Sequence, residues 1–384
     1  MPDFLGIDLG ATKVAYVLAN GDGDFIFEKT YTSPYKKTSN TLSDGEPEVF
    51  LDTILTDIPI EERALRYLAQ TEADFLNAAR KEIGDNNFEG RGYSLCGKTW
   101  TQDGRIAMIG GNTPSRFAAD LGKGKIGIVV ANAADNTVAA NDGNAAATAQ
   151  GIYYKATRGV EPRETGYFIL GTGFGFGVPG YFALTEIGHI PVGLVPELLW
   201  QECDCTDGHK TACAENYASG RGIENTANIL LCLDGSSHLR KLSDCMAAVT
   251  GQADLFDLVA TSKMKANRRT DAKTVMDLAK NSEDGLAVFV ANLAADVTAY
   301  AAVTAAQLFG LQIIGIGETV AQSNPWHVDT IAGKVDSYVD GSTILRPPLK
   351  VELTPLSEPA KYGALALVVP ESRYEAWAEK MKAG

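Results

Sequence analysis

The sequence predicts a mixed α/β protein that folds as more than one domain. Short apolar runs separated by turn residues open the chain, as expected of strands. Longer segments with apolar residues at helical spacing follow, and buried apolar runs recur between them. A single hydrophobic core seldom grows beyond about 250–300 residues, so the 384 residues of this chain favour two or three domains.

The chain begins with a predicted strand–turn–strand–turn–strand unit. Apolar runs occupy residues 4–9, 14–18 and 25–27, and an Asn-Gly pair before the third run is a clear hairpin signal. A turn of small residues joins the first two runs at 10–13. We therefore expect a β-meander with Asp8 embedded in its first strand.

Helices and buried strands are predicted to recur along the rest of the chain. The expected helices cover 61–83, 142–152, 216–231, 284–308, 359–369 and 371–382. The expected strands cover 126–130, 167–170, 311–316 and 351–353. Two polar or aperiodic segments, 33–58 and 232–272, are interpreted as insertions.

Composition argues against several classes of protein. The formal net charge is −14, and a phosphate backbone is contacted mainly by Lys and Arg, so nucleic acid is a poor candidate partner. The N-terminus lacks the basic segment of a signal peptide. We also find no run that reaches the roughly 20 apolar residues of a membrane span. We therefore expect a cytoplasmic protein without nucleic-acid or membrane partners.

Metal-binding residue types gather between residues 186 and 215, where three of the six cysteines lie. Clustered cysteines in a reducing compartment favour a metal over disulfides. A Cys₃His set is an established zinc arrangement, and the candidate ligands are His189, Cys203, Cys205 and Cys213. His209 is a rival fourth ligand, and a loop of free cysteines is the alternative. Glu186 and Glu215 flank the cluster, which indicates a further ligand nearby.

The first turn of small residues has the features of a phosphate loop. Gly10 lets the backbone turn tightly, and small neighbours let amide groups approach an anion. Thr12 and Lys13 can reach phosphate oxygens, and Asp8 could hold Mg²⁺ through water. The alternative is a hairpin turn with a surface lysine.

A second candidate phosphate loop follows the predicted strand 167–170. Glycines alternate there, from Gly171 through Thr172 and Gly173 to Gly177, and such a turn frees backbone amides for phosphate. A β-bulge or a plain loop is an equal alternative. The spacing is not that of the dinucleotide fingerprint, and no helix start follows.

Asn141 and Asp142 precede an alanine-rich predicted helix. One interpretation is an N-cap, a position that Asn and Asp favour. The other is a carboxylate at a helix start facing a cleft, where Asp142 would take the proton of a substrate hydroxyl as a general base. Both interpretations stay open at this stage.

Gly317 and Glu318 end the predicted strand 311–316. A glycine at a strand end lets the backbone come close to a ligand. We interpret this corner as a candidate contact to a nucleotide base.

The order of these motifs resembles that of the ROK family of sugar kinases, within the larger group that includes hexokinase, actin and the Hsp70 ATPase domain. The resemblance spans roughly residues 4–370, apart from the two insertions. The segments that carry it are 8–13, 141–146, 170–173, 186–189, 203–215, 219–220 and 314–318. It implies a two-domain actin-like ATPase fold, of the ribonuclease H-like type, with a cleft between the domains.

The resemblance also implies the domain boundaries. The first domain would be 1–140, with the insertion near 33–58, completed by the C-terminal helix 371–384. The second would be 141–370, with the second phosphate loop, the zinc loop and the insertion near 232–272. In the family the two domains close over the cleft, which excludes water.

The implied activity is ATP-dependent phosphorylation of a hexose or amino-hexose, expected at the 6-hydroxyl, with Asp142 as the general base. The sugar contacts would be Asn112, Asn141, Asp142, Glu186, His189 and Glu215. The ATP and phosphate contacts would be Asp8, Gly10, Thr12, Lys13, Gly171, Thr172, Gly173, Gly317 and Glu318. One ring nitrogen of His189 would bind zinc and the other would face the sugar. Mg²⁺ would arrive with ATP, and a homodimer is expected.

The chain departs from the family pattern in its loops. Thr206 replaces a usual glycine among the cysteines, and Phe176 replaces one in the second phosphate loop. The stretch between Gly173 and Glu186 is shorter than usual, and Thr185 stands where glycine is common.

These departures leave three alternatives open. The chain could be a catalytically degenerate sugar-binding member of the family, a regulatory member, or a kinase that uses polyphosphate in place of ATP. Regulators of the family carry a winged helix before the first phosphate loop, and here that loop begins at residue 6. The sequence therefore favours the kinase over the regulator.

Overall fold

The computed structural model describes most of the chain, and every structural statement concerns the residues it describes. These are 3–10, 13–32, 57, 60–84, 88–102, 104–109, 128–132, 136–180, 187–192, 212–250, 254–267, 269–340, 349–356 and 359–382.

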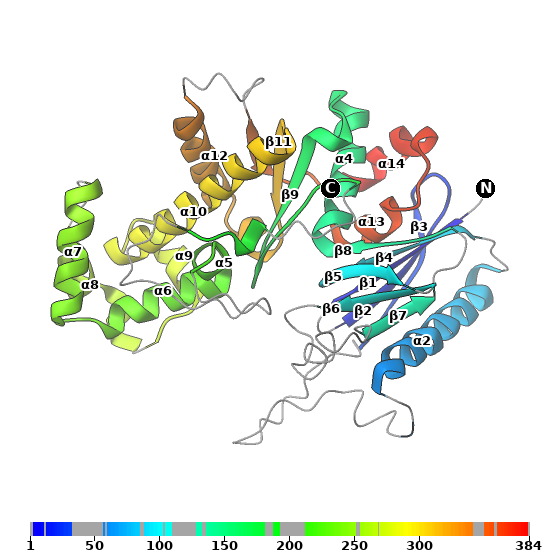
Figure 1. Cartoon of the computed structure of the whole chain (residues 1–384), viewed down its shortest axis with the longest axis horizontal. Helices are drawn as coiled ribbons and strands as arrows, with labels where there is room; N and C mark the ends of the chain where they lie inside the picture. The colour runs from blue at the N-terminus through cyan, green and yellow to red at the C-terminus, as the bar shows by residue number, and fades with distance from the viewer. Residues whose placement is uncertain are drawn as a thin grey trace. The chain divides into compact units, whose positions relative to one another are not determined.

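The chain divides into two compact units (Figure 1). The first unit combines Met1–Gly166, Gly177–Thr185 and Pro355–Gly384, and the second combines Tyr167–Phe176 with Glu186–Thr354. This division assigns residues 141–166 to the first unit, whereas the sequence-based boundary falls at residue 140. That boundary stays a prediction.

A five-stranded sheet with the order β3-β2-β1-β4-β8 forms the centre of the first unit. Its strands are β1 (Asp3–Leu9), β2 (Lys13–Ala19), β3 (Phe25–Thr32), β4 (Phe88–Leu95) and β8 (Thr137–Asn141). The first three strands form the expected antiparallel meander. β1, β4 and β8 run parallel to one another, so their carboxyl ends share one edge of the sheet.

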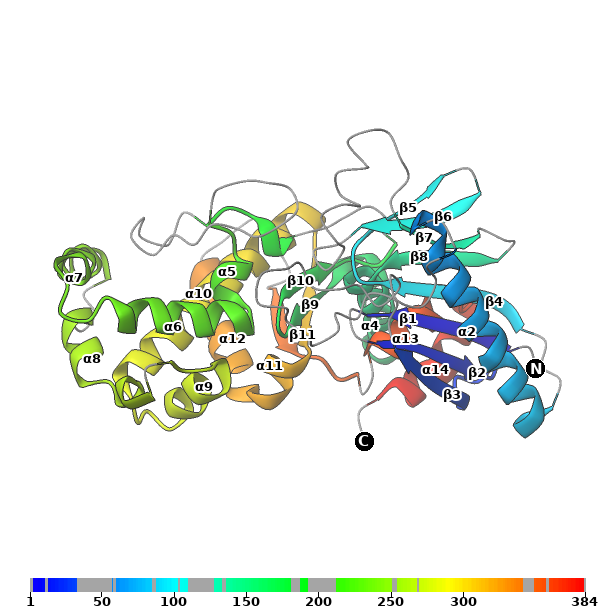
Figure 2. The same ribbon diagram turned by 90° about the horizontal axis from the view of Figure 1, so that it is seen from below.

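Helices cover both faces of this sheet (Figure 1 and Figure 2). They are α2 (Ile60–Ile83), α4 (Asp142–Arg158), α13 (Pro359–Ala366) and α14 (Tyr374–Met381), with short 3₁₀ turns at Pro162–Glu164 and Glu371–Arg373. Successive residues of a strand face opposite sides of a sheet. Ile7 belongs to the core shared with α2, whereas Gly6 packs against Leu365 of α13. α2 and α13 therefore lie on opposite faces.

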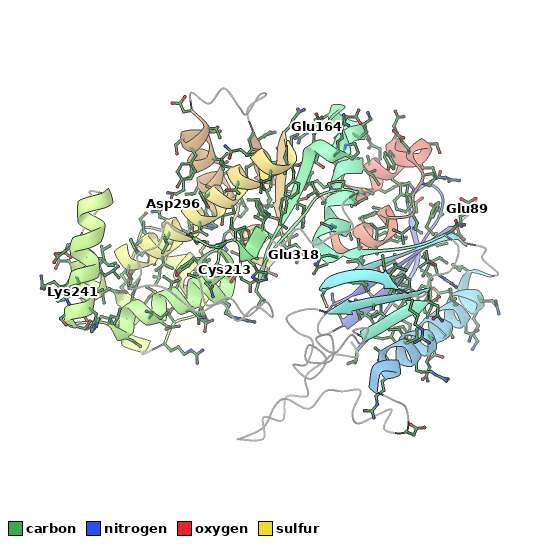
Figure 3. All side chains as sticks on the ribbon, in the orientation of Figure 1. Glu89, Glu164, Cys213, Lys241, Asp296 and Glu318 are labelled. Atoms are coloured by element: carbon green, nitrogen blue, oxygen red, sulfur yellow. The ribbon has the colours of Figure 1, made fainter. Side chains whose placement is uncertain are left out.

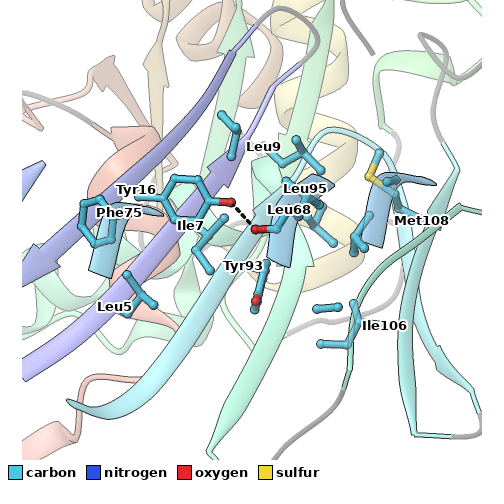
Figure 4. Close-up of a cluster of buried hydrophobic side chains, with 14 of the residues drawn as sticks. Leu5, Ile7, Leu9, Tyr16, Leu68, Phe75, Tyr93, Leu95, Ile106 and Met108 are labelled. Carbon is cyan, nitrogen blue, oxygen red and sulfur yellow. Dashed lines mark hydrogen bonds between the residues drawn. The ribbon is translucent and has the colours of Figure 1, made fainter. Parts of the chain in front are cut away.

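The core beneath α2 is built around Tyr16 (Figure 4). Its hydroxyl donates a hydrogen bond to the carbonyl of Leu68 at 3.1 Å and lies 2.7 Å from the hydroxyl of Thr71. The ring stacks on Phe75, with centroids 5.5 Å apart. A buried tyrosine hydroxyl needs such partners, and here α2 supplies all three contacts.

β4 was not predicted because its sequence, FEGRGYSL, contains two glycines, which weaken a strand signal. The structure gives those glycines a reason. A β-carbon on Gly92 would lie 1.7 Å from the carbonyl oxygen of Ala364, and one on Gly90 would lie 2.8 Å from Val368. Glycine at position 92 lets α13 pack directly on the strand, and glycine at position 90 leaves room for Val368 just after that helix.

The first unit also contains a small antiparallel sheet with the order β5-β6-β7. Its strands are β5 (Lys98–Gln102), β6 (Arg105–Ile109) and β7 (Ile128–Asn132). Only β7 was expected from the sequence. β5 follows directly from the carboxyl end of β4, so this sheet extends from the edge where the parallel strands end.

The second unit has a four-stranded sheet with the order β10-β9-β11-β12. Its strands are β9 (Thr165–Leu170), β10 (Phe174–Gly177), β11 (Ile313–Gly317) and β12 (Lys350–Leu353). The helices are α5 (Glu215–Ala218), α6 (Gly220–Cys232), α7 (Ser237–Thr250), α8 (Leu255–Thr261), α9 (Ala272–Lys280), α10 (Gly285–Phe309), α11 (Thr319–Ser323) and α12 (Pro325–Val339), with 3₁₀ turns at Ile187–His189 and Lys263–Asn267.

The segment 232–272, interpreted from sequence as an insertion, is mostly helical. Side chains fix the helix starts: Asp254 accepts from the backbone of Phe256, and Asp271 accepts from that of Thr274. Asn228 of α6 exchanges two hydrogen bonds of 2.9 Å with the backbone of Thr270. Short capped helices of this kind give only weak periodicity, which explains why the sequence did not reveal them.

α10 corrects the expectation that no segment could span a membrane. With 25 residues it is long and apolar enough by length and composition, yet 67% of its most apolar window is buried inside the unit. Contacts with α9, α12, α6 and α5 account for that burial. Its apolarity is therefore that of a core helix.

His327 of α12 should make stability depend on pH. It is fully buried, and neither ring nitrogen has a hydrogen-bond partner among the described residues. Burial, with a smaller contribution from Lys334, lowers its pKa to about 4. In the unfolded chain histidine titrates near 6.5. The stability contributed by neutral, buried His327 is therefore fully present above that pH and is lost as pH falls toward 4.

We expect His327 to account for about 2 kcal/mol of lost unfolding free energy between pH 7 and pH 5. The measurement is urea unfolding at both pH values for the native chain, His327→Leu and His238→Leu. His238 is exposed, so its variant should keep the full pH dependence, whereas His327→Leu should lose about 2 kcal/mol of it. Equal pH dependence in all three proteins would contradict this assignment.

Candidate active site

Two chain segments that carry predicted site residues, at β1 and β8, meet the end of β4 at the carboxyl edge of the parallel strands in the first unit. Leu9 of β1 pairs in register with Leu95 of β4, and Leu95 pairs with Asn141 of β8. The residues that follow each strand therefore start from the same edge. In open α/β sheets this is the edge where ligands bind.

Asp8 lies at this edge in a partly buried position. The hydroxyl of Ser94 donates a hydrogen bond to its Oδ1 at 2.9 Å. Burial raises the pKa of Asp8, while the Ser94 hydroxyl and the charges of Lys13 and Lys361 oppose that rise. A bound cation would stabilise the carboxylate further, so the position suits a metal-associated group.

The first glycine turn closes with a hydrogen bond from the N–H of Gly10 to the carbonyl of Lys13 at 3.0 Å. This turn joins two antiparallel strands, so the hairpin interpretation is correct for the backbone. The phosphate role of Thr12 falls outside the described residues.

Asn141 and Asp142 stand at the start of α4. Asn141 is the N-cap of α4: its Oδ1 accepts from the N–H of Gly143 at 2.9 Å, and its Nδ2 donates to the carbonyl of Gly97 at 3.3 Å. Asp142 is the first residue of the helix, with Oδ1 2.8 Å from the same N–H. Both side chains thus accept from the N–H of Gly143, which agrees with the capping interpretation, and the general-base role of Asp142 stays a prediction.

Cys96 was expected to be a plain buried thiol, but it lies beside both acids. Its N–H donates to the carbonyl of Leu9 at 3.2 Å. Burial raises the pKa of its thiol, and the charges of Asp142 and Asp8 raise it further. The thiol is therefore a neutral neighbour of the two carboxylates.

In the second unit, the backbone N–H and carbonyl of Phe174 connect three predicted motifs. Its N–H donates to Oε2 of Glu215 at 3.0 Å. Its carbonyl oxygen lies where a β-carbon on Gly188 would approach to 1.8 Å, so only glycine fits there. β10 thus fixes both Glu215 and the turn that ends in His189.

His189 and Cys213, two of the four predicted zinc ligands, lie close together (Cys213 is labelled in Figure 3). The distance from Nδ1 of His189 to Sγ of Cys213 is 3.7 Å. Asn216 holds the cysteine, since its Oδ1 accepts from the N–H of Cys213 at 3.0 Å. No cluster of three metal-ligating residues occurs within the described ranges.

Several predicted site residues lie outside the described residues, and their positions stay predictions. They are Thr12, Asn112, Glu186, Cys203 and Cys205, together with the rival ligand His209.

The second glycine loop is the turn between β9 and β10. The N–H of Gly171 donates to the carbonyl of Gly173 at 3.1 Å, and the N–H of Gly220 donates to the carbonyl of Gly171 at 2.8 Å. The start of α6 therefore packs against this loop. As expected, no helix follows the loop directly.

A pocket of about 820 Å³ adjoins this loop within the second unit. Gly171 and Thr172 line it together with residues of α6, α9 and α11 and of the segment before α9. The volume lies within the range typical of small-molecule sites. Sequence reasoning missed the charged lining residues, because ordinary surface helices carry the same residue types.

Glu318 follows β11 beside the pocket, and its backbone is unusual. Its φ is 74° and its ψ is −178°, a region that is essentially restricted to glycine and costs about 1–3 kcal/mol. A β-carbon built on Gly171 would lie 3.5 Å from the β-carbon of Glu318. The side chain therefore starts next to the second glycine loop.

Comparison with known proteins establishes the family. A family model described as ROK family matches residues 129–369. The chain belongs to the ROK family. No curated protein sequence matches it.

Solved ROK structures share the fold with this chain. A ROK glucokinase from Streptomyces griseus in complex with glucose and AMPPNP is 19% identical, with a TM-score of 0.55 over 95% of this chain and 98% of that one. A ROK hexokinase from Thermus thermophilus is 18% identical, with a TM-score of 0.57 and coverage of 94% and 97%. A ROK transcriptional regulator, a homologue of the E. coli MLC protein, is 17% identical, with a TM-score of 0.59 and coverage of 99% and 80%. The predicted actin-like ATPase fold is thereby confirmed.

Phe176, the departure from the ROK pattern in the second loop, belongs to the core. It is 2% exposed, and its ring lies 4.9 Å from that of Phe168 and 5.9 Å from that of Phe309. Phe174 is equally buried, so the two phenylalanines alternate with the glycines along β10. The side chain therefore packs into the unit and does not fill the loop.

Gly188→Ala should disturb the His189 turn because the new methyl would overlap the carbonyl of Phe174. We expect a loss of about 1–3 kcal/mol in unfolding free energy, as for overpacking elsewhere. Gly333→Ala is the matched control, since a methyl group added to this glycine of α12 would find no atom within 4 Å. Urea unfolding of both variants measures the difference, and equal stability would contradict the close approach.

Proposed function

We propose that this ROK protein is an ATP-dependent sugar kinase that phosphorylates the 6-hydroxyl of a hexose or amino-hexose. The observation that carries the proposal is the edge of β1, β4 and β8, where Asp8 lies at the end of β1 and Asp142 directly follows β8. One acid lies in a cation-favouring position, and the other begins a helix that is capped by a different residue. Phosphoryl transfer requires both a metal-associated group and a group that orients the nucleophile.

Asp142 would act on the sugar. The sugar hydroxyl oxygen forms a bond to the γ-phosphorus, the bond from that phosphorus to the bridging oxygen of ADP breaks, and the hydroxyl proton passes to the Asp142 carboxylate. The N–H of Gly143 at 2.8 Å from Oδ1 fixes the orientation of this carboxylate. Positioning and charge stabilisation then supply most of the rate enhancement.

Asn141, Glu215 and His189 are further proposed sugar contacts. The side chain of Asn141 is held by Gly143 and Gly97. Glu215 is oriented by the Phe174 N–H, and His189 follows the close contact at Gly188. Glu186 and Asn112 complete the proposed set. Carboxylates and an imidazole are suitable partners for sugar hydroxyl groups.

ATP would bind to the second unit, with its nucleoside in the 820 Å³ pocket and its phosphates at Gly171, Thr172 and Gly173. The corner at Gly317 and Glu318 would border the adenosine. Mg²⁺ bound with ATP would neutralise charge on the phosphates. Asp8, Gly10, Thr12 and Lys13 are the further proposed phosphate contacts.

Zinc would be held by His189, Cys203, Cys205 and Cys213. Bonds of about 2.3 Å to sulfur and 2.0–2.1 Å to nitrogen at a tetrahedral angle put the two ligand atoms about 3.6 Å apart. The 3.7 Å between Nδ1 and Sγ fits such a site. Binding through Nδ1 would leave Nε2 of His189 toward the sugar, and zinc would supply structure rather than chemistry.

The packing of Phe176 bears on the alternative of a degenerate site. That alternative was motivated by the shortened stretch between Gly173 and Glu186 and by the replacement of a usual glycine in the second loop, and the packing concerns the second of these. Because the ring lies in the core with Phe168 and Phe309, it leaves the loop backbone accessible. We therefore favour the active kinase.

Asp142→Asn should lower kcat by about 10²–10⁴-fold, because it removes the proton acceptor and preserves the size of the side chain. The measurement is ADP release with MgATP across glucose, fructose, mannose, allose and their amino and N-acetyl derivatives. The control is Asp257→Asn, which removes an exposed carboxylate from the first turn of α8 and should leave kcat unchanged. Equal turnover of the native chain and Asp142→Asn would exclude Asp142 as the base.

Removal of zinc should weaken sugar binding by at least about tenfold before it affects MgATP binding, since the metal would orient His189. The test strips the protein with a chelator, restores Mg²⁺ and follows both ligands by calorimetry, with zinc counted by elemental analysis. Cys213→Ser should reproduce the loss, and Cys232→Ser, at an exposed cysteine of α6, should not. Native protein without zinc, or unchanged sugar binding after stripping, would contradict the proposed site.

A further inference from the structure

The pocket beside the second glycine loop has a balanced charge. Its ionisable lining consists of three basic and three acidic side chains: Arg221, Arg269, Lys273, Glu224, Asp271 and Asp277. Nη2 of Arg269 lies 3.2 Å from Oε1 of Glu224, and Nζ of Lys273 lies 2.6 Å from Oδ2 of Asp277. Two of the three cations are thus already paired with acids. A chain of phosphates binds through uncompensated Lys and Arg charges, so this lining suits a neutral group.

Glu318, labelled in Figure 3, begins its side chain beside the glycine loop and directly precedes two pocket-lining residues. Its β-carbon lies within van der Waals distance of the space beside Gly171, and the next two residues, Thr319 and Val320, line the pocket. Its backbone lies in a region essentially restricted to glycine. Strain of this kind persists mostly where it serves a function.

The junction between the loop and the pocket separates two kinds of phosphate donor by their charge. A nucleoside triphosphate would place three phosphates at the loop and an uncharged ribose and base beyond them. An inorganic polyphosphate would continue past the junction with about one negative charge on every further phosphate. A carboxylate at the junction repels the second donor and tolerates the first, whose ribose hydroxyls can donate to it.

Building on the proposed kinase activity, we propose that Glu318 is the residue that selects a nucleoside triphosphate over inorganic polyphosphate. It acts through charge at the boundary of the phosphate loop. The backbone strain is a consequence of placing a carboxylate where glycine would fit best.

The experiment compares four full-length proteins by calorimetry with MgATP, tripolyphosphate and long-chain inorganic polyphosphate. They are the native chain, Glu318→Gln, Glu318→Gly and Asp340→Asn. Glu318→Gln removes the charge and keeps the length and the backbone requirement. Asp340→Asn is the control because it removes a carboxylate of the second unit that lies far from the pocket. Asp340 directly follows α12, and the 15 residues of α12 span about 22 Å from the end of the helix beside the pocket.

We expect the ratio of polyphosphate affinity to MgATP affinity to be at least about tenfold higher in Glu318→Gln than in the native chain, because polyphosphate binds more tightly. The gain should shrink as salt increases, because ions screen the repulsion. Glu318→Gly should show the same gain and a Tm about 2–4 °C higher, since it also relieves the strain. Asp340→Asn should match the native chain.

Two outcomes would overturn the proposal. One is an unchanged ratio of polyphosphate affinity to MgATP affinity in Glu318→Gln. If that ratio rises in Glu318→Gly alone, the backbone strain at this position, and not the charge, controls donor binding. The other is a loss of about tenfold or more in MgATP affinity in Glu318→Gln, which would make Glu318 a ligand of the nucleotide or its metal. Failure to phosphorylate any sugar with any donor would refute the kinase and leave the donor-binding ratio as an independent result.

Discussion

The second unit depends on the backbone of one residue, Phe174 in β10. Its N–H is bound by Glu215 and its carbonyl is covered by Gly188, while its side chain is stacked on Phe168 in the core. Three motifs far apart in the sequence are therefore held by adjoining atoms. The glycine loop, the carboxylate and the histidine turn take their relative positions from a strand of four residues. A rigid sheet strand is a better support for such a constellation than a loop would be.

In the first unit, the register of the parallel strands brings the candidate site residues together. Leu9, Leu95 and Asn141 are neighbours across three parallel strands, so Asp8, Cys96 and Asp142 gather at one edge of the sheet. Asn141 caps α4, and Asp142 follows it as the first residue of that helix. Ser94, on the adjacent strand, donates a hydrogen bond to the carboxylate of Asp8.

The sequence predicted the elements whose burial is continuous and missed those shaped by distant contacts. β1 and β2 are buried along nearly their whole length, so they appear as apolar runs. β4 carries glycines that only α13, more than two hundred residues later, explains. The glycine loops and Asp142 were found because their residue types suit a particular chemistry. The charged lining of the pocket and the conformation of Glu318 have no local signature, because they depend on which helices pack against the loop.

The packing of α13 on Gly92 also orders the events of folding. The sheet of the first unit packs much of its second face against residues 359–382, and Trp377 donates to the carbonyl of Gly21 across 356 positions of sequence. Apart from its first strand pair, the second unit is continuous in the chain. During synthesis the second unit can therefore complete its core while the first still exposes much of one face. Long-range closure of this kind slows folding and prolongs the exposure of apolar surface, so the N-terminal meander is the part of this protein that most needs protection as it is made.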